Sequence, residues 1–229
     1  MMRERLVLMK DLLSPTGSIY VHLDWHAVHY VKVLLDELFG YERFINEIIW
    51  YYPDYIQGNA TTAFAKKNDL ILFYTKSEDY YFERVSVKLD KPTLRNKVIW
   101  NKETKKLEVG RDKDGKIIYE EFTEKFLDQM WQIGQTAVTR VTSGEYTGYP
   151  TQKPIELLRR IIKASCPQNG VILDAFMGSG TTCETAELLA DELNCTWIGI
   201  DNSKFSVHTA RKRLIDSGTY RGLRHRKGL

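Results

Sequence analysis

The segment Val171-Ile172-Leu173-Asp174-Ala175-Phe176-Met177-Gly178-Ser179-Gly180-Thr181-Thr182 decides the fold of this chain. It starts as an apolar run typical of a buried strand, passes through two glycines and continues as a helix. Glycines at such a turn let the backbone approach a ligand closely, and the helix N-terminus directs free N–H groups toward that ligand. The segment therefore predicts a strand, a tight ligand-binding turn and a helix.

The residues around the turn discriminate among three classes of ligand. A triphosphate site of the P-loop type needs a lysine where Thr181 follows Gly180. A dinucleotide site prefers a third glycine at the position of Cys183. S-adenosylmethionine has no pyrophosphate and needs neither feature. The next predicted strand, 195–200, ends in Asp201, and a carboxylate there can accept both ribose hydroxyls. A helix cap is the simpler role for Asp201.

The elements around this segment alternate in type. Helices are predicted at 152–165, 180–192 and 203–216, with strands at 170–175 and 195–200. Alternation at this spacing is typical of a parallel α/β sheet. Only two strands lie at or beyond the glycine turn, so the remaining strands of the sheet must come from upstream. The sequence thus predicts a permuted strand order.

The upstream part supplies those elements. It contains predicted helices at 2–13 and from Val28 to the cap at Gly40, and predicted strands at 18–24, 44–52 and 69–75. From about residue 76 to 148 charged and aromatic residues mix, long apolar periodicity disappears, and residues 113–116 are typical of a hairpin turn. We therefore expect three parts: residues 1–75, an inserted module at 76–148, and residues 149–229.

Composition indicates an ordinary soluble globular protein. Hydrophobic residues make up 43% and charged residues 28% of the 229 residues, and the net charge is only +3. No apolar run has the roughly 18 residues of a membrane span, and the N-terminus lacks the apolar core of a signal peptide. The three cysteines show no CxxC spacing, which argues against a structural zinc site and fits a reducing cytoplasm. The tail from Arg221 to Lys227 is basic, which is typical of a solvated tail or a phosphate contact.

Four segments, together with Gly199-Ile200-Asp201, resemble the beta group of amino-methylating DNA methyltransferases. They span nearly the whole chain and occur in the family's order. They are Gly17-Ser18-Ile19-Tyr20-Val21-His22-Leu23-Asp24 with the helix that follows, Asn68-Asp69-Leu70-Ile71-Leu72-Phe73-Tyr74-Thr75-Lys76, Tyr149-Pro150-Thr151-Gln152-Lys153-Pro154, and Asp174 to Thr182. The chain is most similar to the modification subunit of type III restriction–modification systems, which is usually adenine-N6-specific.

The resemblance implies a permuted Rossmann-like, S-adenosylmethionine-dependent methyltransferase fold with an inserted target-recognition module. It places Lys153 near the cofactor's carboxylate and Phe176 against the cofactor. It implies double-stranded DNA as substrate, and it leaves a restriction subunit and a second copy of the chain open as partners. The cofactor-binding residues expected are Lys153, Pro154, Asp174, Phe176, Gly178, Gly180, Thr181 and Asp201, and the expected phosphate contacts are Lys66, Lys67 and Arg140.

Two departures from the family pattern matter. Ala175 stands where the family usually has proline, which should leave the turn intact. The catalytic tetrapeptide Asp-Pro-Pro-Tyr is absent, because no two of the six prolines are adjacent. The segment Tyr52-Pro53-Asp54-Tyr55 has only a superficial similarity to it, and we expect that segment to be a loop. In the family that motif lies upstream of the first helix, on a strand between the strands at 170–175 and 18–24. We therefore expect a divided sheet, and no activity from this chain alone.

Two alternatives remain open. One is a non-catalytic DNA- or partner-binding protein of methyltransferase fold. The other is a cytosine-N4 enzyme, on which the first residue of the absent tetrapeptide would bear.

Overall fold

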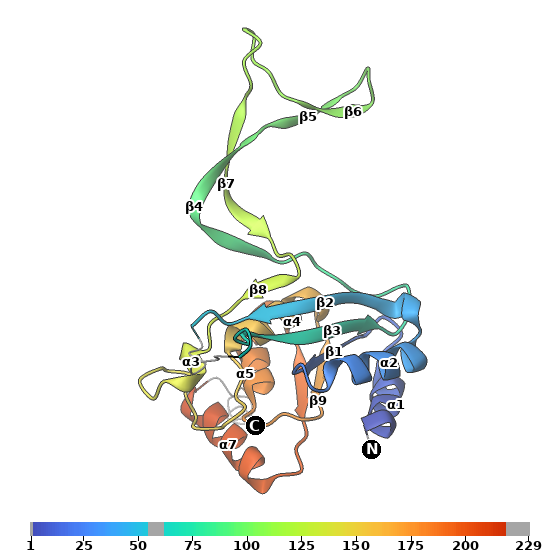
Figure 1. Cartoon of the computed structure of the whole chain (residues 1–229), viewed down its shortest axis with the longest axis vertical. Helices are drawn as coiled ribbons and strands as arrows, with labels where there is room; N and C mark the ends of the chain where they lie inside the picture. Colours follow the sequence, from blue (N-terminus) through green and yellow to red (C-terminus); the bar gives the residue numbers. More distant parts are fainter. Residues whose placement is uncertain (1, 55–61, 219–229) are drawn as a thin grey trace, which may run out of the picture. The chain divides into compact units, whose positions relative to one another are not determined.

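A computed structural model describes residues 2–54 and 62–218 (Figure 1). The basic tail and Tyr55 lie outside the described residues. The chain divides into two compact units, which we call the body (Met1–Glu83 with Gln129–Leu229) and the arm (Arg84–Asp128). The independent unit is thus narrower than the module expected at 76–148, because both flanks of that range belong to the body. No helix among the described residues is long and apolar enough to cross a membrane.

The body holds a four-stranded sheet in the order β1-β3-β2-β8. These strands are β1 (Ser18–Leu23), β2 (Phe44–Tyr51), β3 (Asn68–Thr75) and β8 (Met130–Gln132). The expectation of a parallel sheet is wrong here, because β3 runs antiparallel to both β1 and β2, and only β8 pairs with β2 in parallel. Strand direction depends on how the connecting segments return, and apolar periodicity does not report it.

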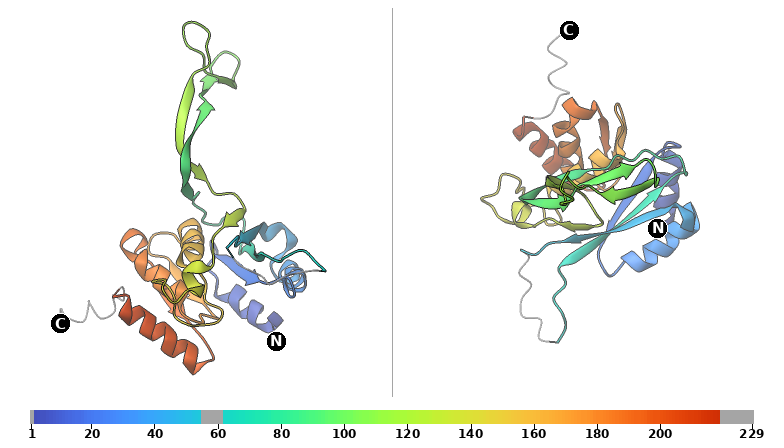
Figure 2. Two further views of the ribbon diagram at one scale, coloured as in Figure 1. Left: turned by 60° about the vertical axis from the view of Figure 1, so that its left-hand side comes forward. Right: turned by 90° about the horizontal axis from the view of Figure 1, so that it is seen from above.

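Two helices cover one face of this sheet, α1 (Met2–Leu12) and α2 (Val28–Phe39) (Figures 1 and 2). A short 3-10 turn, η1 (Tyr41–Arg43), links α2 to β2. The apolar stripes of both helices meet alternate residues of β3, as expected when an amphipathic helix packs on a half-buried strand. The buried cluster consists of Leu6, Val28, Val31, Leu35, Phe39, Leu72 and Tyr74.

A second, two-stranded sheet carries the glycine turn. It pairs β9 (Val171–Asp174) with β10 (Thr196–Gly199) in parallel. The helices of this part are α4 (Ile155–Ser165), α5 (Thr181–Leu188), α6 (Ala190–Leu193) and α7 (Lys204–Asp216), so the single helix expected at 180–192 is interrupted at Leu189. One face of the sheet packs Ile172 and Trp197 against α4 and α5. The opposite face is open: Val171 is 68% exposed and Ile198 is 50% exposed.

Helix α4 connects the two sheets, which do not pair with each other. The Tyr20 hydroxyl on β1 lies 2.6 Å from the Ser165 Oγ at the end of α4, and the Glu83 N–H donates to the Ala164 carbonyl at 2.8 Å. Among the described residues, β1 pairs only with β3 and β9 only with β10, so each keeps one unpaired edge. A sheet divided between these two strands is what the sequence predicts.

The arm consists of two antiparallel hairpins. The longer pairs β4 (Ser86–Asn96) with β7 (Tyr119–Phe126), and the shorter pairs β5 (Val98–Asn101) with β6 (Lys106–Val109). The expected turn near 113–116 is present, because the Asp112 N–H donates to the Lys116 carbonyl at 2.8 Å and Gly115 has a φ of +80°. At the base of the arm the Leu127 N–H donates to the Val85 carbonyl at 2.9 Å.

Candidate ligand-binding site

The glycine turn between β9 and α5 requires both of its glycines. Gly178 and Gly180 have φ values of +50° and +77°, which side chains disfavour. A Cβ on Gly178 would lie 3.3 Å from the Tyr149 ring, and a Cβ on Gly180 would lie 2.6 Å from the Cβ of Ala210 on α7. Gly180 therefore serves the packing of α7 as well as the shape of the turn.

Asp201, two residues after the end of β10, connects this turn to the start of α7. Its carboxylate accepts the N–H of Gly178 at 2.9 Å and the N–H of Ser203 at 2.8 Å. These backbone N–H groups, the Ser203 one foremost, lower the pKa of Asp201. The Ser206 side chain and the Asn202 N–H also hydrogen-bond to this carboxylate, which has about four acceptor positions in all. The contacts therefore show the capping role of Asp201, and its ribose role stays a prediction.

Asp174 and Phe176, at the end of β9, have different surroundings. The Asp174 carboxylate accepts the Phe176 N–H at 3.0 Å and the Thr182 hydroxyl at 2.5 Å, so it braces the turn from inside. The Phe176 ring is 51% exposed, and the Arg5 guanidinium lies 5.4 Å from its centroid. A half-exposed aromatic face next to the turn can pack against a planar ligand.

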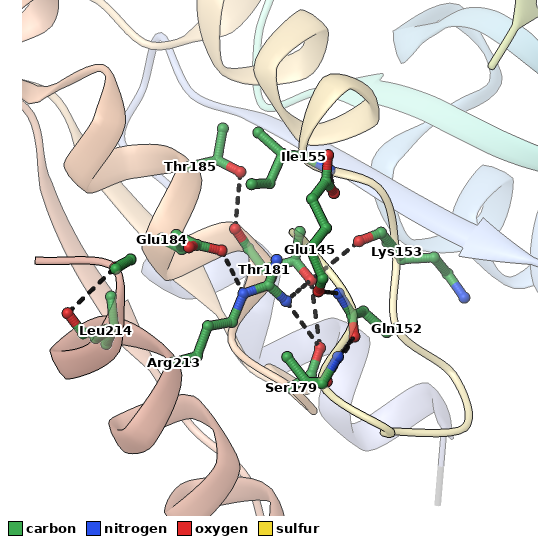
Figure 3. Close-up of polar contacts among 12 residues, drawn as sticks. Glu145, Gln152, Lys153, Ile155, Ser179, Thr181, Glu184, Thr185, Arg213 and Leu214 are labelled. Carbon is green, nitrogen blue, oxygen red and sulfur yellow. Dashed lines mark hydrogen bonds and ion pairs between the residues drawn. The ribbon is translucent and has the colours of Figure 1, made fainter. Parts of the chain in front are cut away.

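The segment before α4 reaches the glycine turn through a polar network (Figure 3). The Thr181 hydroxyl donates to the Lys153 carbonyl at 3.2 Å and accepts from Arg213 Nη1 at 2.8 Å. Pro154, buried and with a φ of −66°, caps the start of α4. Gln152 closes the loop ahead of it by accepting the Thr147 N–H at 3.0 Å. The expected residues Lys153, Pro154 and Thr181 are therefore brought together.

A buried ion pair between Arg213 on α7 and Glu184 on α5 underlies this network and was not expected from sequence (Figure 3). Arg213 Nε donates to the Glu184 carboxylate, while its Nη2 has no hydrogen-bond partner among the described residues. Charged groups are rarely buried unless paired, so this pair fixes α7 against α5. No local spacing links two residues 29 positions apart, and therefore no sequence pattern could have revealed it.

The Lys153 side chain extends toward a second polar cluster that sequence reasoning also missed. Burial lowers the pKa of Lys153, and the Asp69 carboxylate opposes that shift. Asp69 lies 3.0 Å from His22 Nε2 and accepts from the Tyr52 hydroxyl at 3.4 Å. The Lys153 Nζ lies 5.8 Å from the centroid of the Trp50 ring. His22 and Asp69 both lie in segments that resemble the family. That resemblance was the one sequence signal that could have pointed to this cluster.

The expected phosphate contacts lie in two separate segments. Lys66 and Lys67 precede β3, and Arg140 follows the short helix α3 (Thr136–Thr139). The Lys66 Nζ stands 3.1 Å from the centroid of the exposed Trp25 ring, and Lys67 Nζ donates to the Pro53 carbonyl at 3.0 Å. Arg140 is exposed. Among the described residues, no group of three His, Cys, Asp or Glu could hold a metal ion.

Comparison with known proteins gives a consistent set of matches. Residues 1–212 match the model of a family described as DNA methylase, N6_N4_Mtase. The chain is 30% identical to the type II methyltransferase M.EcaI of Enterobacter cloacae over 93% of its own length and 56% of that protein. It is 28% identical to M2.LlaDCHI of Lactococcus lactis subsp. cremoris, covering 95% of the chain and 67% of the relative. The chain thus spans between about half and two thirds of these relatives.

Solved structures of low sequence identity share the fold. The M1.HpyAVI–SAM complex superposes with a TM-score of 0.59 at 22% identity, covering 93% of this chain and 81% of the other. The cytosine-N4-specific PvuII DNA methyltransferase gives the same TM-score at 13% identity, covering 93% and 72%. The α/β architecture expected from sequence is therefore confirmed.

Proposed function

The chain belongs to the N6/N4 DNA methylase family, and from this premise we propose that it takes part in transferring a methyl group from S-adenosylmethionine to the N6 amine of adenine in DNA. The observation that carries the proposal is the glycine turn held between Asp201 and the segment of Lys153. It joins, at one place, the groups suited to the ribose and to the methionine end of that cofactor.

The residues of the site fit this cofactor. Lys153 is a half-buried lysine whose ammonium donates to the Thr151 carbonyl at 3.2 Å, and burial lowers its pKa while Asp69 opposes the shift. A bound carboxylate would pair with this ammonium and offset its loss of hydration. The Asp201 carboxylate, hydrogen-bonded to the glycine turn, is placed to accept ribose hydroxyls in exchange for its present contacts, and the half-exposed Phe176 ring is suited to pack on the adenine. The cofactor supplies an electrophilic methyl group when bound.

The choice of adenine rests on the resemblance to adenine-N6 modification enzymes. A cytosine-N4 activity is the alternative, since the family includes both. The relationship to type III modification subunits also stays a prediction, because the relatives compared above are named as type II enzymes. Partnership with a restriction subunit and pairing with a second copy of the chain are further expectations of the same kind.

We infer that the binding site for the target base is supplied by a segment outside these 229 residues. An adenine amine is a poor nucleophile, so the base must be flipped out and its N–H groups held by acceptors beside an aromatic ring. The sequence contains no Asp-Pro-Pro-Tyr to do this. The unpaired edges of β1 and β9, with the open face of the β9–β10 sheet, are suited to receive a further strand and a covering helix.

We assign target recognition to the region 76–148, of which the arm forms the independent part. Exchanging this region with that of a relative should change the methylated sequence of a complete enzyme, whereas an unchanged target would refute the assignment.

A non-catalytic protein of the same fold is the second candidate function, favoured by the absent tetrapeptide. Methyl transfer by the completed enzyme separates the two.

Calorimetric titration of S-adenosylmethionine into the folded chain tests the cofactor site. Asp201→Ala should weaken binding by about 1–3 kcal/mol because ribose hydroxyls lose their acceptor. Lys153→Gln should weaken binding similarly through the lost carboxylate partner. Lys163→Gln is the matched control, because Lys163 is a half-buried lysine on α4 that is paired with Glu192 at 2.7 Å. If all four proteins titrate alike, the assignment of Asp201 and Lys153 is wrong.

A further inference from the structure

The short hairpin β5–β6 of the arm has one entirely apolar face. In the antiparallel register Val98 stands opposite Val109, and Trp100 stands opposite Leu107. Directly opposed residues project to the same side, and side chains two apart on a strand share that side. All four side chains are therefore on one face, and they are 54%, 41%, 58% and 68% exposed, in the order Val98, Val109, Trp100, Leu107.

The opposite face of this hairpin is mainly polar. It carries Ile99, Asn101, Lys106 and Glu108, and the side chains of Asn101 and Glu108 hydrogen-bond at 2.9 Å. The hairpin is thus amphipathic, and its apolar face is exposed. An isolated two-stranded hairpin is only marginally stable in water, so an apolar face of this kind indicates a surface that becomes covered by a partner.

The charge of the hairpin identifies the chemistry of that partner. Residues 97–111 contain five Lys or Arg and two Glu, a net charge of +3, which equals the net charge of the whole chain. The rest of the molecule therefore sums to zero. Lys97 is paired with Glu120 at 3.1 Å, and the Arg111 guanidinium donates to the Gly115 carbonyl at 2.7 Å.

Three further lysines surround the turn between β5 and β6. They are exposed and form no ion pair with any described residue. They are Lys102, Lys105 and Lys106. Lys102 and Lys105 lie in the turn, and Lys106 lies on the mainly polar face opposite Asn101, so exposed ammonium groups flank the apolar face. This combination suits duplex DNA, in which charged phosphates flank base edges that are partly apolar.

We propose that the β5–β6 hairpin enters the major groove of duplex DNA, with its apolar face against the base edges and Lys102, Lys105 and Lys106 against the phosphates. The major groove admits a two-stranded ribbon, and apolar side chains contact thymine methyl groups there. This inference rests on the proposed DNA substrate and adds the residues that meet it. A second copy of the chain is disfavoured, because four side chains offer far less than the roughly 800 Å² that each partner of a stable interface buries.

The salt dependence of duplex binding tests the charged part of the proposal. The probe is a mixed-sequence 20-base-pair duplex, titrated into the full chain at several salt concentrations. K102Q/K105Q/K106Q should lower the slope of log K against log salt by about 2 to 3, because each lost phosphate contact removes about 0.9. The control R3Q/K125Q/K163Q removes the same net charge from cations that lie near carboxylates, and it should leave the slope almost unchanged.

The affinity for the same duplex, compared at each salt concentration, tests the apolar face. W100S/L107S should weaken binding about tenfold at every salt concentration without changing the slope. Trp100→Phe, which keeps an aromatic ring on the same face, should retain most of the wild-type affinity. Equal slopes for the two triple variants, or wild-type affinity in W100S/L107S, would overturn the proposal. So would a self-association of the chain that W100S/L107S abolishes while duplex binding persists. Cofactor titration of the same samples reports on the methyltransferase proposal independently.

Discussion

Gly180 is subject to two constraints that come from different parts of the molecule. Its φ of +77° is set by the turn that starts α5, and the close approach of Ala210 on α7 leaves no room for a Cβ. Gly218, at the end of α7, has a similar φ of +64° but would meet no atom within 4 Å. The two positions therefore separate backbone strain from crowding.

Gly180→Ala should destabilise the body by about 2–5 kcal/mol in urea unfolding. A left-handed backbone costs a non-glycine residue about 1–2 kcal/mol, and overpacking against Ala210 adds about 1–3 kcal/mol. Gly218→Ala should show the first cost alone. Adding Ala210→Gly to Gly180→Ala should recover the packing part. Equal losses at Gly180 and Gly218 would mean that α7 moves aside without cost.

At the scale of elements, β1 and β3 carry a titratable pair between them, His22 and Asp69. Burial lowers the pKa of His22, and its hydrogen bond to the Asp69 carboxylate only partly opposes this shift. The folded state therefore holds His22 neutral at a pH where the unfolded chain begins to protonate it. Between the lowered pKa and the ordinary value of 6.5 the unfolded state binds more protons, so stability falls as the pH falls through that window.

The urea midpoint of the wild-type chain should accordingly decrease between about pH 7 and about pH 5, and His22→Gln should lose less over the same range. Glutamine keeps a hydrogen-bond donor for Asp69 but does not titrate. His208→Gln, at an exposed position on α7, is the control and should behave like the wild type. A His22→Gln variant with the full wild-type pH dependence would assign the loss to other groups.

Individual elements show which features a sequence can predict. The helix predicted at 203–216 is α7, because Ser203 caps it by accepting the Ser206 N–H, a signal that lies within the local sequence. The direction of β3 and the Arg213–Glu184 pair could not be predicted, since both depend on contacts between distant segments. The glycine turn was predictable as a local motif. The surroundings of Lys153 were not, because Asp69 lies 84 positions away.

For the whole molecule, the divided sheet predicts that the 229-residue chain needs a completing segment. The unpaired edges of β1 and β9 and the exposed apolar side chains of the β9–β10 sheet, Val171 and Ile198 among them, lack the packing that a complete sheet supplies, against a total stability of only about 5–15 kcal/mol. Supplying a strand and helix with the Asp-Pro-Pro-Tyr motif, roughly 50 residues, should raise the thermal midpoint and permit methyl transfer. The measurement is tritiated-methyl transfer to DNA by a monodisperse sample, with and without the segment.

The same assay contains the outcome that would contradict this expectation. Turnover by the 229-residue chain alone, at about one per minute or faster, would mean that the binding site for the target base lies within the present sequence. A completing segment whose tyrosine and aspartate are replaced is the control, because it should stabilise the body without restoring transfer.

The base of the arm has a consequence for how such a protein diversifies. Because the Leu127 N–H donates to the Val85 carbonyl at 2.9 Å, the first and last residues of the arm lie side by side. Any other segment that starts and ends as a paired hairpin can be spliced in at these two points without displacing a strand of the body. If the arm determines the DNA target, as proposed, recombination at these two nearby points would be enough to give a lineage a new target.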